Sequence, residues 1–187
     1  AALLHSQWVT GEYWDRHKVA KRDRPIPPAK MAKRIQALAA KAPTTLPWRT
    51  VRDAIADLPD PRTRAAAAIR DHKFQDGAKV YPGHTGSPLD QPAKTIKAGA
   101  HGVPGGENMM VLPDGSVRYF SARETARIQT FPDGYVFHGS WTETMRQLGN
   151  AVPVALGRIV ASSVGEALIR AEINQLRATV GSARVAA

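Results

Sequence analysis

The stretch RYFSARETARIQTFPDGYVF, residues 118–137, contains the clearest local structural pattern in this sequence. Ser121 is followed three residues later by Glu124, which is the spacing of a capping box at the start of a helix. Pro132 stops the element, because proline has no backbone N–H to continue a helix. The pattern therefore predicts a short helix that begins after Ser121 and ends before Pro132.

A second stretch, TMRQLGNAVPVALGRIV at residues 144–160, follows closely. TETMRQL predicts a short helix with Thr142 as its N-cap. We expect a tight turn at Gly149-Asn150 and then a longer helix from about Pro153, since proline loses no hydrogen bond at a first helical position. The turn either only starts this helix or also holds Asn150 against a ligand. The helix has one apolar stripe, formed by Leu156, Ile159, Val160, Val164 and Leu168.

Two more short helices are predicted upstream. TVRDAIADLP has Thr50 as N-cap, Asp53 at the third helical position and Pro59 as its stop. AKMAKRIQALAAKA, residues 29–42, has apolar side chains on one helical face and cations elsewhere. The basic, Pro-rich residues 17–30 predict an extended, exposed segment before it.

Residues 71–120 are crowded with Gly and Pro and contain only short strand-like pieces, at 93–98, 108–112 and 116–120. PDGS at 113–116 predicts a hairpin turn, because Asp-Gly tolerates positive φ between two apolar runs. Loops of this length in a compact chain often carry function, and a solvated loop cluster is the alternative.

Charge indicates the class of partner. The formal net charge is +10 for 187 residues, and the first fifty residues alone carry ten Lys or Arg against three Asp or Glu. Such a balance favours a polyanion, most often nucleic acid, over a merely solvated basic surface. There are no cysteines, which excludes disulfides, thiolate metal sites and cysteine nucleophiles within this chain. We expect a cytoplasmic protein without a membrane helix or signal peptide.

Taken together and in this order, the two long stretches resemble the ninth and tenth shared motifs of the DNA cytosine-5 methyltransferase family. SPLDQPAKTIKAG, residues 87–99, resembles the approach to the ninth motif within the variable target recognition region of that family. The resemblance covers residues 45–170 well and the first 45 residues only loosely.

The departures from the family pattern define what is missing. The Phe-x-Gly-x-Gly, Pro-Cys-Gln, Glu-Asn-Val and Gln-x-Arg-x-Arg motifs of the family are absent from this sequence. Attack on cytosine C6 needs a thiolate, which this chain does not contain. The resemblance therefore implies the C-terminal part of such an enzyme, either a naturally split subunit or a domain of a longer chain.

The resemblance also implies roles for individual residues. Asn150, Ala151 and Val152 are expected to line the pocket for S-adenosyl-L-methionine (AdoMet) from the tenth-motif side. No catalytic residue and no metal site are expected in this chain. The expected DNA-binding residues, which include those of the loop YPGHTGS, are Lys79, His84, Thr85, Ser87, Lys94, Thr95 and Lys97. The ninth-motif residues expected to organise the recognition region, rather than to perform chemistry, are Arg118, Arg123, Glu124, Arg127 and Gln129.

These observations lead to one predicted organisation. We expect an α+β fold: a small, irregular, β-rich recognition domain with flanking short helices, and a C-terminal helix that docks on a Rossmann-like catalytic domain supplied elsewhere. The expected segments are a basic lead-in with one short helix (1–45), the recognition region with the ninth motif (46–140), the tenth motif with its docking helix (141–175) and a tail (176–187). The expected partners are double-stranded DNA and the N-terminal catalytic domain or subunit of a bacterial methyltransferase, near the nucleoid.

Two other functions stay open. A stand-alone, sequence-specific DNA-binding module would share this architecture and would bind duplex DNA in a salt-dependent way without any methylation. A decayed remnant would fold poorly and bind nothing specifically. The intact ninth and tenth motifs favour the methyltransferase over the remnant.

Overall fold

A cluster of buried aromatic side chains organises the first forty residues into a small helical unit, the N-terminal lobe (residues 1–41). In the computed structural model, which describes residues 1–83, 85–98 and 108–185 and only the backbone of 178–185, this lobe contains α1 (Ala2–Trp8), α2 (Glu12–Arg16), η1 (Lys21–Asp23), η2 (Ala29–Met31) and α3 (Ala32–Ala40). Tyr13 and Trp14 are buried. Their rings pack edge to face, with the ring centroids 4.8 Å apart. Trp14 also donates a hydrogen bond from Nε1 to the Gln7 carbonyl at 2.6 Å.

Of these helices, sequence patterns predicted only α3. Both α1 and α2 are short, and neither has a side-chain cap at its N-terminus. Patterns that depend on caps and periodicity therefore gave no signal for them. The expectation of a single short helix in residues 1–45 was wrong.

The second unit contains a three-stranded sheet in the order β1-β2-β3. Strand β2 (Met109–Val111) pairs antiparallel with β3 (Val117–Tyr119), and Gly115 has φ of +84° in the turn between them. The PDGS hairpin is thereby confirmed. Strand β1 (Ser87–Pro88) pairs parallel with β2. The predicted strand at 93–98 was wrong, because this segment runs past the sheet without joining a ladder, although Ile96 is buried.

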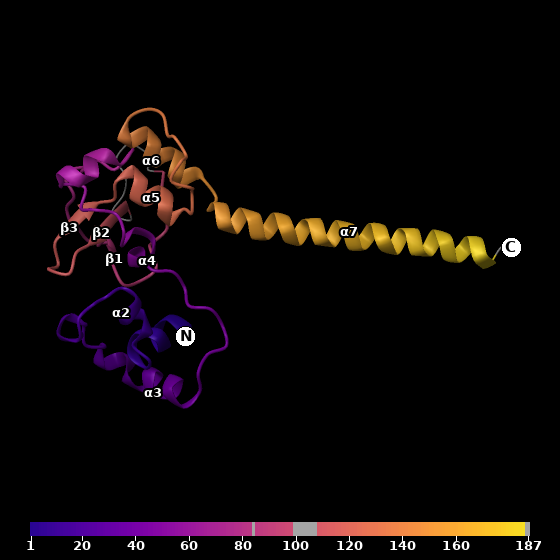
Figure 1. Cartoon of the computed structure of the whole chain (residues 1–187), viewed down its shortest axis with the longest axis horizontal. Coiled ribbons are helices and arrows are strands. Elements are labelled where there is room, and N and C mark those ends of the chain that lie inside the picture. Colours follow the sequence, from indigo (N-terminus) through magenta and orange to yellow (C-terminus); the bar gives the residue numbers. More distant parts are fainter. Residues whose placement is uncertain (84, 99–107, 186–187) are drawn as a thin grey trace.

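Helices α4 (Val51–Ile55) and α5 (Ala122–Ile128) pack beside the sheet, above the N-terminal lobe in Figure 1. Both begin with capping boxes, Thr50 with Asp53 and Ser121 with Glu124. The N-cap at Thr50 and the capping box at Ser121 were predicted from the sequence. A short η3 (Arg64–Ala68) lies between them in the chain. The main core is formed by Val51, Ile55, Ile96, Met110 and Phe120, and a second core joins α5 to α6 through Ala126, Phe137, Met145 and Leu148.

The C-terminal helices differ from the prediction in three ways. Helix α6 (Trp141–Asn150) begins at Ser140, whose hydroxyl accepts from the Glu143 backbone in a capping box, so Thr142 is not the N-cap. It includes Gly149 and Asn150, so the predicted turn at these two residues was wrong, and the chain turns at 151–153 instead. Helix α7 (Val154–Val185) continues through residues 176–185, which were expected to form a tail.

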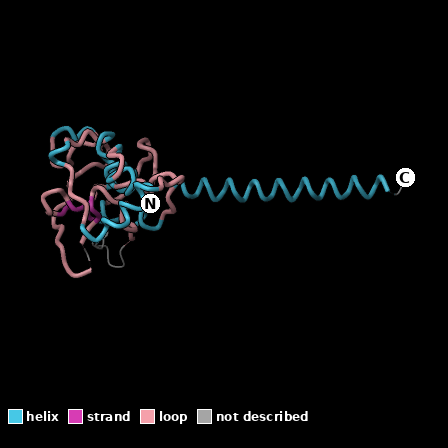
Figure 2. Tube along the Cα trace, turned by 90° about the horizontal axis from the view of Figure 1, so that it is seen from below, coloured by secondary structure: helices cyan, strands magenta, loops and turns pink. Residues whose placement is uncertain are grey.

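Helix α7 projects away from the rest of the molecule in both views (Figures 1 and 2). Its apolar stripe is uncovered: Leu156, Ile159 and Leu168 are 50%, 66% and 66% exposed. A window within residues 141–177 has a mean hydropathy of 1.5, and none of that window is buried. By length and composition this helix could cross a membrane, which differs from the expectation drawn from the sequence.

Candidate functional site

A buried ion pair joins strand β3 to helix α5. Arg118 donates from its two terminal nitrogens to the two carboxylate oxygens of Glu124, at 2.7 and 2.6 Å. The same carboxylate accepts the Ser121 backbone N–H at 2.8 Å, which completes the capping box. Glu124 is 1% exposed and Arg118 6% exposed, so this charge pair holds the start of α5 against the sheet away from water.

Arg123 organises the loops around α5. Its side chain is buried and donates to the carbonyl oxygens of Arg70, Pro132 and Tyr135 and to the carboxylate of Asp71. These acceptors lie on two separate loops. Arg123 and Glu124 are therefore not paired with one another: Glu124 ties α5 to β3, and Arg123 ties it to the loops at 70–71 and 132–135.

Arg127 lies at the surface end of α5 between two aspartates. It donates to both oxygens of Asp133 at 2.8 and 2.6 Å and to Asp57 at 2.5 Å. The hydrogen bonds to Asp133 raise the pKa of Arg127, and the same bonds lower the pKa of the Asp133 carboxyl. This cation is neutralised within the chain and is not presented to a phosphate.

Gln129 connects the ninth motif directly to the tenth. Its side-chain amide donates to the carbonyl oxygens of Leu148 and Ala151 at 2.7 and 3.3 Å. The backbone carbonyl of Gln129 accepts a hydrogen bond from the Val154 backbone N–H at 3.0 Å. One residue of the ninth motif thus satisfies backbone groups at the end of α6 and at the start of α7, and it fixes both sides of the 151–153 turn. We call these three hydrogen bonds the Gln129 bracket.

Gly149 lies against the chain's own backbone. A Cβ at this position would be 2.2 Å from the Ala98 nitrogen and 2.4 Å from the Lys97 carbonyl carbon. The sequence suggested that this glycine lets backbone approach a ligand, and the close approach is instead to the segment that carries Lys94 and Lys97. The absence of a side chain here lets α6 pack against that segment.

The three expected cofactor residues lie at the end of α6 and on the turn that follows it. Asn150 is exposed, and within the described part of the chain its side chain makes no hydrogen bond. Val152 is 63% exposed, whereas Ala151 is half-buried. A cleft of about 410 Å³ opens beside them, lined by Gly149, Ala151 and Pro153, by Arg127–Thr130 and by segments near Arg49 and Lys94. Of the three expected cofactor residues, Ala151 lines this cleft, and Asn150 and Val152 are not among its lining residues.

The expected DNA-binding residues gather on one segment, with exceptions. Thr85, Thr95, Lys79 and Lys97 are exposed, and Lys94 donates from Nζ to the Thr85 hydroxyl at 2.8 Å. Ser87 is fully buried and its hydroxyl accepts the Lys94 backbone N–H at 3.0 Å. Ser87 therefore shapes the loop from inside the fold, and its burial differs from the exposed, DNA-binding position expected from the sequence. His84 lies outside the described residues.

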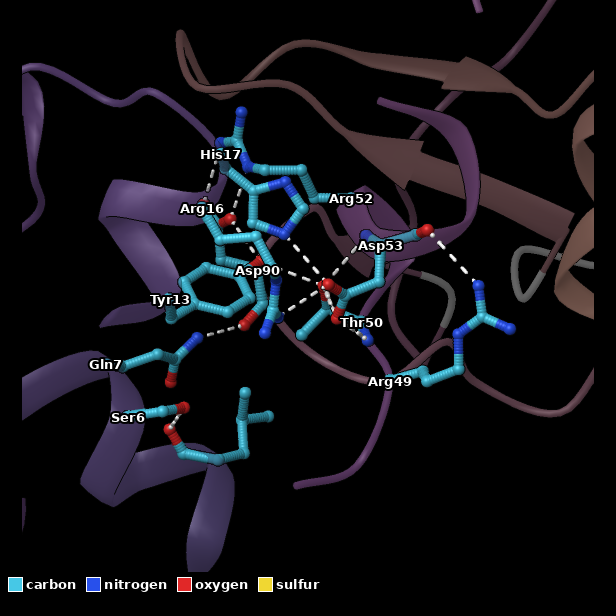
Figure 3. A network of polar contacts seen from close by, with 11 residues as sticks. Ser6, Gln7, Tyr13, Arg16, His17, Arg49, Thr50, Arg52, Asp53 and Asp90 are labelled. Atoms are coloured by element: carbon cyan, nitrogen blue, oxygen red, sulfur yellow. Dashed lines mark hydrogen bonds and ion pairs between the residues drawn. The ribbon is translucent and has the colours of Figure 1, made fainter. Parts of the chain in front are cut away.

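Asp90 joins the N-terminal lobe to this segment, and no sequence pattern had marked it (Figure 3). Its carboxylate accepts from Tyr13 at 2.7 Å and from the Arg52 guanidinium at 2.6 and 3.0 Å, and its carbonyl accepts from Gln7 at 2.7 Å. Burial and the Asp90 contact raise the pKa of Tyr13 above its ordinary value. The partners lie 38 to 83 residues from Asp90 in the chain, so local spacing carries no signal for them.

A second contact holds the same two units together. Asp53 accepts from Arg16 at 2.7 Å and lies 2.8 Å from the His17 ring nitrogen. Burial raises the pKa of Asp53, but hydrogen bonds from Thr50 and His17 outweigh it and leave that pKa below its ordinary value. Among the described residues, no group of three His, Cys, Asp or Glu could hold a metal ion.

Comparisons with known proteins identify the class of enzyme that this chain is similar to. The chain is 39% identical over 77 residues to a Type II methyltransferase, M.AplI, of Arthrospira platensis, which is 41% of this chain and 22% of that protein. It is 51% identical over 51 residues to the Type II methyltransferase M.AgeI of Thalassovita gelatinovora, or 27% of this chain and 12% of that protein. A rice DNA (cytosine-5)-methyltransferase, CMT2, is 35% identical over 68 residues, 36% of this chain and 5% of that protein.

These matches span about a quarter or less of the length of the curated relatives named above. No solved structure matches this chain. The sequence model of the C-5 cytosine-specific DNA methylase family matches residues 15–166, which include α3 to α6, the Gln129 bracket and the start of α7. The chain belongs to the C-5 cytosine-specific DNA methylase family.

Proposed function

We propose that this chain is the target-recognition part of a DNA (cytosine-5)-methyltransferase and completes its AdoMet pocket. The reaction would transfer a methyl group from AdoMet to cytosine C5 in duplex DNA, only together with a catalytic portion that supplies the thiolate. The observation that carries the proposal is the Gln129 bracket, which fixes the ninth and tenth motifs together and leaves Asn150 and Val152 exposed.

We propose that the turn at 151–153 and the adjoining Asn150 contact AdoMet from one side. Gln129 fixes both sides of the turn at 151–153 through hydrogen bonds within the chain. The Asn150 amide can donate to and accept from a polar cofactor, and Val152 offers an apolar surface. When bound, AdoMet supplies the methyl group. The role of this chain is to bind and orient the cofactor from this edge, because pre-ordered contacts cost less on binding.

Helix α7 supports the need for a partner. Its apolar stripe is uncovered along residues 154–176, while monomeric soluble proteins rarely expose continuous apolar patches of that extent. Small residues at Ala155, Gly157 and Gly165 permit close approach of another backbone. We propose that this stripe packs on the catalytic domain and that this docking brings the Asn150 turn to the cofactor.

The segment around Lys94 would hold the DNA. Lys79, Thr95 and Lys97 are suited to contact phosphates, which positions the duplex without specifying its sequence. The target cytosine must leave the base stack to react, and the recognition region would hold the opened duplex meanwhile. The relatives bearing Type II methyltransferase names favour a restriction-modification setting in a bacterial cytoplasm.

The experiment is transfer of labelled methyl groups from AdoMet into duplex DNA. The full chain, a catalytic portion carrying the missing motifs, and their mixture are assayed in parallel. We expect methyl transfer only in the mixture. Duplex binding by the chain without methyl transfer in any well-folded mixture would contradict the proposal and favour a stand-alone DNA-binding module.

A further inference from the structure

The N-terminal lobe carries a concentration of cations that the proposed DNA-binding segment does not use. No Asp or Glu occurs between Asp23 and Asp53. The cations in this interval are Arg24, Lys30, Lys33, Arg34, Lys41, Arg49 and Arg52. A stretch of this length without acidic residues concentrates positive charge on whatever surface it forms.

Ion pairs divide these cations into two groups. Arg24 pairs with Asp15 and Arg52 with Asp90, so both are neutralised inside the molecule. Lys30, Lys33, Arg34 and Lys41 are exposed and have no ion-pair partner among the described residues. Within the interval 24–52 the cations without an ion pair are therefore those on η2 and α3, Lys41 and Arg49. Lys18 and Lys21, earlier in the lobe, are also exposed and have no ion-pair partner among the described residues.

The orientation of α3 presents this charge to solvent. Met31, Ile35 and Leu38 are half-buried, and α3 contacts α1. At the helical repeat of 3.6 residues, Lys33 lies on the side of α3 opposite Ile35, and Arg34 lies at the edge of the apolar side, next to Leu38. Lys30 and Lys41 lie just before and just after α3 and are exposed. The apolar side of α3 is thus used for packing, and the exposed cations lie along and at both ends of the helix. We call Lys30, Lys33, Arg34 and Lys41 the α3 strip.

The α3 strip is held at a fixed position relative to the recognition segment. Gln7 of α1 and Tyr13 of α2 both donate to Asp90, three residues after Ser87. Arg16 and His17 contact Asp53 at the start of α4. Four contacts from α1, α2 and the residue after it therefore join the lobe to the unit that carries Lys94 and Lys97 (Figure 3).

We infer that the α3 strip binds the phosphate backbone of duplex DNA, separately from the segment 79–97. This inference rests on the proposed function for the choice of DNA among polyanions. The chemistry required is a group of exposed cations without ion-pair partners, and no Asp or Glu interrupts the sequence between Asp23 and Asp53. Contacts of this kind are independent of base sequence, so the strip adds affinity and orientation while the recognition segment supplies selectivity.

The test measures how duplex binding by the full chain depends on salt. A duplex of roughly 30 base pairs and arbitrary sequence is the probe, and Kd is measured between about 0.05 and 0.3 M NaCl. The test variant is Lys33→Gln with Arg34→Gln. The control is Arg158→Gln with Arg177→Gln on α7, which also lowers the formal net charge from +10 by two charges. Circular dichroism verifies that both variants keep the wild-type helix content.

For the α3 variant we expect a less steep plot of the logarithm of the binding constant against the logarithm of the salt concentration. The slope should fall in magnitude by about 0.9 for each phosphate that the protein no longer binds. The control variant should leave this slope unchanged. Binding by the α3 variant near 0.1 M salt should weaken roughly tenfold. Equal slopes for the two variants would overturn the inference, since weaker binding would then reflect overall charge alone.

The two proposals fail in different ways. A wild-type chain that binds no duplex DNA would overturn this inference and the DNA part of the proposed function together. A slope that depends on the α3 strip, combined with no methyl transfer in the complemented mixture, would contradict the proposed methyltransferase function and leave this inference standing.

Discussion

Gly149 of α6 packs so closely against Ala98 that a Cβ at residue 149 would lie 2.2 Å from the Ala98 nitrogen. The tenth motif is thereby joined to the segment 93–98 through close backbone packing. Gln129 joins the same motif to the ninth through hydrogen bonds to Leu148 and Ala151. The end of α6 is therefore the point where the ninth motif, the tenth motif and the segment 93–98 meet.

Gly149→Ala should therefore destabilise the fold strongly. The atoms that a Cβ would meet are backbone, which cannot move aside as a flexible side chain can, so we expect a decrease of about 3 kcal/mol in the free energy of unfolding. Gly157→Ala is the matched control, because nothing lies within 4 Å of a Cβ there and alanine stabilises a helix by up to about 1 kcal/mol. Urea unfolding of both variants measures the difference. Equal stabilities would contradict the close packing.

The Arg118–Glu124 pair should contribute far more to stability than a surface pair. Arg118→Met leaves a buried carboxylate without its cation, which should cost about 3 kcal/mol. The Arg170–Glu166 pair on α7 is exposed on both sides, and Arg170→Met should change stability by no more than about 0.5 kcal/mol. Thermal and urea unfolding compare the two. A similar small effect for both would show that the buried pair is not a structural link.

Sequence patterns predicted those parts of the structure that depend on neighbouring residues. The N-cap at Thr50 and the capping box at Ser121 were predicted because the partners lie within one helical turn. The same local logic was wrong at α6, whose N-cap is Ser140. Contacts such as Tyr13 with Asp90 depend on residues far apart in the chain, and no spacing rule reports them. The packing role of Gly149 was missed because its neighbour, Ala98, is also distant in sequence.

Tyr13→Phe tests the junction at Asp90. The substitution keeps the ring against Trp14 and removes the hydroxyl that contacts Asp90 at 2.7 Å and Thr50 at 2.8 Å. We expect a decrease of about 1–2 kcal/mol in unfolding free energy, with faster amide hydrogen exchange at Val51 and Arg52, which donate to Gln91 and Leu89.

Tyr135→Phe is the control for this substitution, because the Tyr135 ring is half-exposed. Its free energy of unfolding should lie within about 0.5 kcal/mol of the wild-type value. Unfolding in urea and hydrogen exchange followed by NMR measure both variants. Unchanged exchange in Tyr13→Phe would mean that the hydroxyl does not hold the segment.

Asp60 should titrate at unusually low pH. Hydrogen bonds from Arg62 hold its pKa at about 2, below the ordinary value near 3.9. Because the folded pKa is depressed, the stabilisation is fully present above about pH 4 and is lost as the pH falls toward about 2. Carboxyl NMR titration of the wild type and of Arg62→Gln measures both values. An Asp60 pKa near its ordinary value in the wild type would contradict the Asp60–Arg62 contact.

The exposed turn of this chain is proposed to complete an AdoMet pocket, and steady-state kinetics of the complemented mixture tests that role most directly. Asn150→Ala is compared with Asn174→Ala, an exposed position on α7. We predict that Asn150→Ala raises the KM for AdoMet about tenfold, the equivalent of about 1.4 kcal/mol, while the KM for DNA stays unchanged and Asn174→Ala matches wild type. An unchanged KM for AdoMet in Asn150→Ala would contradict a cofactor-binding role for this turn.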